Sequence, residues 1–113
     1  MITERKVSEK LRSIGIPANL RGFAYIKTAV VLVSHDESYI YAITKRLYPD
    51  IARKHNTTAP RVERTIRHAV EHAFLEGDAD ELGTLGAARY SDGKMTSGEF
   101  ISALYENLKY AEG

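Results

Sequence analysis

The side chains best suited to chemistry in this 113-residue chain are three arginines, Arg61, Arg64 and Arg67, spaced three residues apart. At about 100° per residue, this spacing places them on one side of a helix. A guanidinium group is a planar fork that matches O6 and N7 of guanine in the major groove of DNA. Glu63 lies among them, and a carboxylate accepts hydrogen bonds from the amino group of cytosine. The pattern predicts contacts to base edges from Arg61, Glu63 and Arg64.

The charges around these residues are segregated along the chain. Residues 45–67 contain seven basic and two acidic side chains, a local net charge of +5, whereas residues 71–92 contain six acids and one base, a net of −5. A positive pole of this kind suits a polyanion. Phosphates would repel Glu63, so its presence favours base reading over backbone binding alone. The side chains expected to contact the DNA backbone are Lys45, Arg46, Arg53, Lys54, Thr58 and Arg67.

The segment that carries the arginines meets the requirements of a helix-turn-helix. It covers residues 48–67, with the sequence YPDIARKHNTTAPRVERTIR. Ala52 provides the small residue where the second helix crosses the first, and Asn56 tolerates the left-handed conformation that the turn needs. The second helix buries aliphatic residues at helical spacing: Val62, Ile66, Ala69, Val70 and Ala73. We therefore expect the motif at about residues 48–75, with a recognition helix at about 59–75.

The rest of the pattern predicts an all-α, single domain over residues 1–113. The expected elements are a helix capped by Thr3 and ended by Gly15, a buried helix over 22–34, a helix over 37–47, a short helix from Tyr48 with Pro49 in its first turn, a helix capped by Thr58 with Pro60 in its first turn, a short helix from 78 to 83 or 86, a loop over 86–95, and a last helix capped by Thr96.

The composition excludes several classes of protein. Cysteine is absent, which excludes disulfides and thiolate metal sites and agrees with a reducing cytoplasm. No apolar run approaches the roughly 20 residues of a membrane span, and the N-terminal residues do not resemble a signal peptide. We therefore expect a cytoplasmic protein that uses no cofactor.

Several segments carry a more specific likeness. They are ITK at 43–45, LYPDIA at 47–52, NTTA at 56–59, RVER at 61–64, IRHA at 66–69 and GIPA at 15–18. With them the chain resembles, over essentially its whole length, the C-terminal effector domain of the master sporulation response regulator of endospore-forming bacteria. The resemblance implies a six-helix domain and a transcription factor that activates some sporulation genes, represses others, and reads duplex DNA with a TGTCGAA-type element.

The resemblance also implies roles for particular residues. Arg61, Glu63 and Arg64 match base-contacting positions, and Arg67 and His68 lie beside them near the backbone. The family's last helix pairs two domains on tandem sites, and RNA polymerase is a further candidate partner. Pairing would bring four residues near a partner: Phe100, Ile101, Leu104 and Tyr105.

Three features depart from the resemblance. Pro60 stands where a serine is expected, which removes a hydroxyl group. His55 replaces an aromatic residue. The family's receiver domain is not in this sequence, so the chain is either an excised domain or a standalone relative.

Two other functions compete with DNA binding. His68, Glu71 and His72 form an H-x-x-E-H string, the pattern of an inverted zinc peptidase, with Glu99 as a possible further ligand. A site of this kind also needs a substrate cleft, for which the chain leaves little room. The second alternative is a helical protein-interaction module without a nucleic-acid partner. The register of Ala52, Asn56 and Val62 counts against it.

Overall fold

Helix α2 (Arg21–His35) lies at the centre of the fold, and α1, α3, α4 and α6 pack against it. Ala29, Val30 and Val33 are fully inaccessible to solvent, which confirms the expected core helix. Val31 and Leu32 are only partly buried, so the apolar run is not enclosed on every side.

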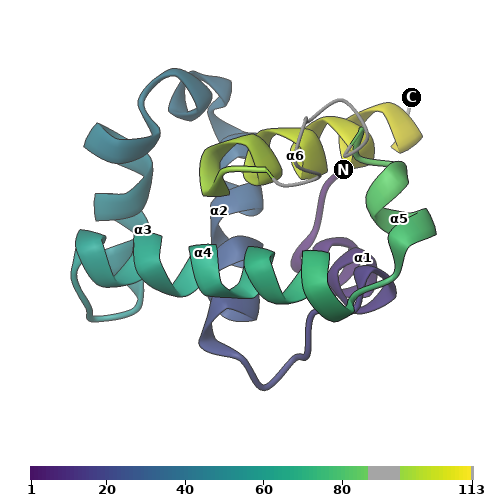
Figure 1. The fold of residues 1–113 in the computed structure, drawn as a ribbon. Helices are drawn as coiled ribbons and strands as arrows, with labels where there is room; N and C mark the ends of the chain where they lie inside the picture. Colours follow the sequence, from purple (N-terminus) through teal and green to yellow (C-terminus); the bar gives the residue numbers. More distant parts are fainter. Residues whose placement is uncertain (87–94, 113) are drawn as a thin grey trace.

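The computed structural model describes residues 1–86 and 95–112, in which every regular element is a helix (Figure 1). The all-α prediction is therefore confirmed. The expected loop over 86–95 lies outside the described residues, except for its two ends. No helix in the described part of the chain has the length and apolar character to cross a bilayer. The elements are α1 (Glu4–Ile14), α2, the 3₁₀-helix η1 (Glu37–Tyr41), the π-helix η2 (Ile43–Leu47), α3 (Tyr48–Lys54), α4 (Ala59–Glu76), α5 (Ala79–Gly83) and α6 (Ser97–Glu112).

Local capping signals fix several helix ends where the sequence predicts them. The backbone N–H of Lys6 donates to Thr3 Oγ1 at 3.2 Å, and Gly15 ends α1 with φ 103°. At the start of α6, Thr96 and Glu99 form a reciprocal capping box, with hydrogen bonds of 2.8 and 3.1 Å. These bonds satisfy backbone donors that a helix terminus otherwise leaves unpaired.

The prediction of one helix over residues 37–47 is wrong. The segment is divided at Ala42, whose φ of −147° and ψ of 48° are not helical. None of the residues in η1 is fully buried, although Tyr39 and Ile40 pack against the core, and polar contacts add to this packing. Asp36 accepts from Ser38 and Arg46, and Glu37 accepts from Tyr105 and from Lys109 at 2.7 Å. Side-chain contacts of this kind compete with a regular helical ladder.

A close crossing of α2 positions α4, the predicted recognition helix. A Cβ atom added at Gly22 would lie 2.5 Å from Ala69 Cβ and 2.8 Å from the Thr65 carbonyl oxygen. Real Cβ atoms do not approach other atoms so closely, so only glycine allows the two helices to cross here.

We expect Gly22→Ala to lower the free energy of unfolding by roughly 1–3 kcal/mol, because the methyl group must displace the backbone of α4. Urea denaturation followed by circular dichroism measures the change. Gly83→Ala is the matched control, since a Cβ there meets no atom within 4 Å. Equal stabilities of the two variants would show that the α2–α4 crossing tolerates a side chain.

Candidate nucleic-acid interface

Helices α3 and α4 and the turn between them lie where the helix-turn-helix is predicted. Ala52 is buried where α3 packs against α4. Asn56 has φ 54° and is the one described non-glycine residue with positive φ, as its place in the turn predicts. Thr58 caps α4, with its Oγ1 accepting from the Arg61 backbone N–H at 3.4 Å. The predicted apolar face is buried in full: Val62, Ile66, Ala69, Val70 and Ala73.

His55 connects the turn to α2. Its Nε2 lies 2.8 Å from Thr28 Oγ1, and its ring packs edge-on against Tyr25 with centroids 4.9 Å apart. The imidazole therefore takes the packing place expected for a larger aromatic residue and also makes a hydrogen bond across the two elements.

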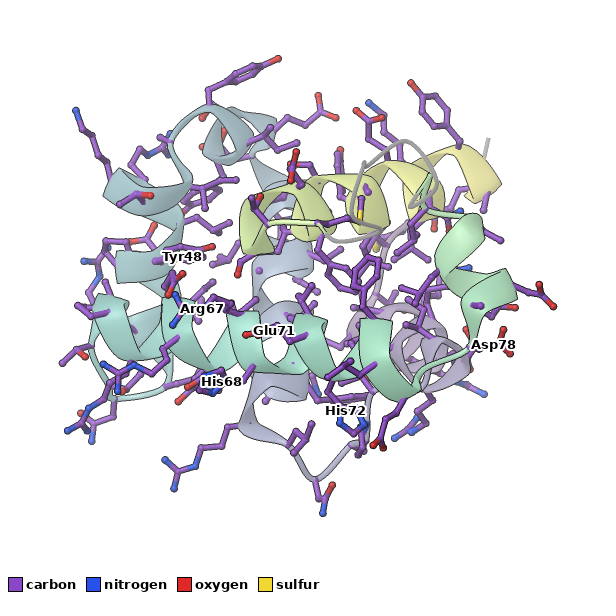
Figure 2. All side chains as sticks on the ribbon, in the orientation of Figure 1. Tyr48, Arg67, His68, Glu71, His72 and Asp78 are labelled. Atoms are coloured by element: carbon purple, nitrogen blue, oxygen red, sulfur yellow. The ribbon has the colours of Figure 1, made fainter. Side chains whose placement is uncertain are left out.

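Arg61 and Arg64 lie on the exposed face of α4, opposite its buried residues. Neither makes an ion pair with a described residue, so both guanidinium groups are available to a ligand. The same face continues along the helix through Arg67, His68 and Glu71 (Figure 2). The structure therefore brings the predicted arginines together on one accessible surface near the start of α4.

Glu63 is already paired in the unbound domain. Arg67 Nη1 donates to both of its carboxylate oxygens, at 3.1 and 3.2 Å, and Arg67 Nε lies 4.0 Å from Glu71. Glu63 and Arg67 are 37% and 51% exposed, and ion pairs one helical turn apart at the surface stabilise a protein by only about 0.3–0.5 kcal/mol. A stronger partner can therefore replace Arg67.

The expected backbone-contacting residues fall into two groups. Lys45 and Lys54 are exposed and form no ion pair within the described residues. Arg46 instead binds Asp36 at 3.1 Å and Ser38 at 2.8 Å and stacks on Tyr39, and Arg53 pairs with Asp50. Thr58 and His68 are exposed at the start and on the outer side of α4. Fewer of the predicted cations are therefore free to contact DNA than the sequence suggests.

The residues expected near a partner domain lie inside the protein. Phe100, Ile101 and Leu104 are fully inaccessible, and Tyr105 is 5% exposed with its hydroxyl bound to Glu37. Their side chains complete the core that α6 shares with α2 and α4, so they are not available as a contact surface in this conformation. The spacing of these residues on one helix face was itself a signal for a core position.

The H-x-x-E-H string does not form a metal site in the described part of the chain, where no three histidine or acidic side chains are placed to hold an ion. His68 is exposed on α4, and Glu71 lies 4.0 Å from Arg67. Glu99, the possible further ligand, accepts a hydrogen bond in the capping box of α6.

The family described as "Sporulation initiation factor Spo0A C terminal" matches residues 7–108. The matched range contains α2 to α5 and most of α1 and α6. It therefore includes the whole helix-turn-helix and every residue proposed to contact DNA.

The left-handed residue of the turn gives a testable prediction. We expect Asn56→Ala to lower the free energy of unfolding by about 1 kcal/mol, because alanine is strained at φ 54°. Asn56→Gly should keep or raise the stability, because glycine adopts this conformation without strain. Thermal and urea unfolding curves measure both variants, and a stable Asn56→Ala protein would contradict the conformation of the turn.

Proposed function

The chain belongs to the family of the C-terminal domain of the sporulation initiation factor Spo0A, and on this basis we propose that it is a sequence-specific transcription regulator that inserts α4 into the major groove of DNA. The family is one of DNA-binding regulatory domains and not of enzymes. The proposal rests on Arg61 and Arg64, two exposed arginines in the first two turns of α4. Neither has an ion-pair partner in the described part of the chain.

The first residues of a recognition helix are those that reach base edges. A bidentate arginine–guanine pair contributes about 1–3 kcal/mol to discrimination against a wrong base. Arg61 and Arg64 supply two such forks, one turn apart, and a TGTCGAA-type element offers guanines on both strands. Cytosine in the same element offers the amino group that Glu63 accepts from.

Binding would rearrange the pair between Glu63 and Arg67. In the unbound domain Arg67 occupies the carboxylate, at 3.1 and 3.2 Å. A phosphate near α4 would attract Arg67, leaving Glu63 free to face a base. Because the pair is half-exposed and weak, this exchange requires little free energy.

Contacts to phosphates would come first from Lys45 and Lys54, which have no ion pair within the described chain. Thr58 and His68 would add hydrogen bonds beside them. Arg46 and Arg53 would have to leave internal partners, Asp36 and Asp50, and so contribute less.

The bound domain would also have protein partners. Two domains would associate on tandem elements, and RNA polymerase would contact the bound protein. Because the apolar face of α6 is buried, pairing through α6 would use its exposed residues, such as Glu106 and Tyr110.

Direct base reading predicts a specific loss in Arg64→Ala or Arg61→Ala. We expect either variant to bind the preferred duplex more weakly by roughly 1–3 kcal/mol and to accept other bases at one position. Fluorescence anisotropy with the preferred and a scrambled duplex measures both effects. Arg5→Ala, on the exposed side of α1, is the control and should bind as the original protein does. Equal losses on both duplexes would contradict direct reading.

Backbone contact predicts a different result for Lys54→Ala. This variant should weaken binding to all duplexes by a similar factor and reduce the slope of log affinity against log salt concentration by about one. An unchanged slope would remove Lys54 from the interface. A slope near zero for the original protein would instead favour the protein-interaction module.

A further inference from the structure

The N-terminal end of α2 lies along one edge of the recognition surface. Helix α2 passes behind α4, and its first turn emerges beyond α4 on the side away from α6 (Figure 1). The close approach of Gly22 to Thr65 and Ala69 fixes this crossing at the middle of α4. The residues that precede Gly22 therefore lie at the edge of α4 from which α2 emerges, although they are outside the helix-turn-helix.

Arg21 is the residue that this crossing brings to the edge. It is the first residue of α2, its side chain is exposed, and it makes no ion pair with a described residue. Its neighbours Asn19 and Leu20 carry no charge. On the α4 flank near Thr65, the outward positions one turn away are Arg61 and His68, neither of which is acidic. Arg21 therefore extends the positive surface and is not neutralised by it.

The opposite edge of the same surface belongs to α3. Arg67 lies toward Tyr48 on one side of α4, whereas His68 and His72 lie on the other side, where α2 emerges (Figure 2). Burial raises the pKa of Tyr48, and the charge of Glu63 acts in the same direction, which agrees with Glu63 facing α3. The exposed face of α4 is thus bounded by α3 on one side and by the start of α2 on the other.

A helix in the major groove has a phosphate backbone on each side. The groove is about 12 Å wide, and a helix with its side chains is about 10–12 Å across. When α4 occupies the groove, the cations near α3 meet one wall, and the start of α2 faces the other wall. An arginine is long enough to extend from that edge toward a phosphate and can bind it with two parallel hydrogen bonds.

We propose that Arg21 binds a phosphate on the wall of the groove away from α3, so that α2 and α3 hold the DNA from both sides of α4. The inference rests on the proposed function. According to this inference α2, which lies outside the helix-turn-helix, helps to set the register of α4 on the duplex. Arg21 is then a positioning residue without base preference of its own.

The test compares Arg21→Ala, Arg21→Lys and the control Arg5→Ala in the full chain, with thermal melting to verify folding. Near 0.15 M salt, loss of one phosphate contact should weaken binding roughly fivefold, on preferred and scrambled duplexes alike, and should reduce the salt slope by about one. Arg21→Lys should retain the slope, because it retains the charge. Arg5→Ala should match the original protein.

Duplexes with single neutral methylphosphonate linkages then locate the contact. One neutral linkage should weaken DNA binding by the original protein but not by Arg21→Ala. A second linkage should weaken binding by the original protein but not by Lys54→Ala. The two linkages should lie on opposite sides of the major groove. Both linkages on one wall, or an unchanged affinity and slope for Arg21→Ala, would overturn the inference. If Arg64→Ala still loses base preference in that case, only the role of Arg21 fails. If the original protein binds no duplex, the proposed function fails with it.

Discussion

The crossing of α2 over α4 at Gly22 is the constraint from which the surface of this domain follows. Because a Cβ atom there would lie 2.5 Å from Ala69 Cβ, the two helices meet almost backbone to backbone. The crossing fixes which face of α4 is buried, and therefore which face is outward. Since α2 also packs against α1, α3 and α6, the orientation of α4 is set by the whole core and not by the turn alone.

Fewer cations on this surface are free to meet a ligand than the sequence contains, because some of them are paired within the domain. Arg46 links η2 to Asp36 at the start of η1, and Arg53 pairs with Asp50 within α3. In contrast, Arg61 and Arg64 make no ion pair with described residues. Glu63 and Arg67 occupy each other through a weak, exposed pair. The unbound domain thus keeps the two arginines proposed to read bases solvated and its structural cations paired, which would limit the rearrangement on binding DNA.

The parts of this fold that sequence reasoning predicted are those with local causes. Thr58 and Thr96 cap helices, and Asn56 takes the left-handed conformation, through bonds and torsions within a few residues. The division at Ala42 was missed because the Glu37–Lys109 contact that holds η1 joins residues far apart in the sequence. The place of Arg21 beside α4 was missed for the same reason, since it depends on the contact between Gly22 and Ala69. For Phe100, the apolar spacing indicated the core, but the family resemblance favoured a partner surface.

We propose that the outward face of α4 selects a DNA sequence. Selection from a random duplex library on the purified chain, at near-physiological salt and followed by sequencing, would show whether it does. We expect enrichment of one short element of the TGTCGAA type, with guanines placed for two arginine forks. Recovery of duplexes without any common element, or no recovery at all, would contradict it.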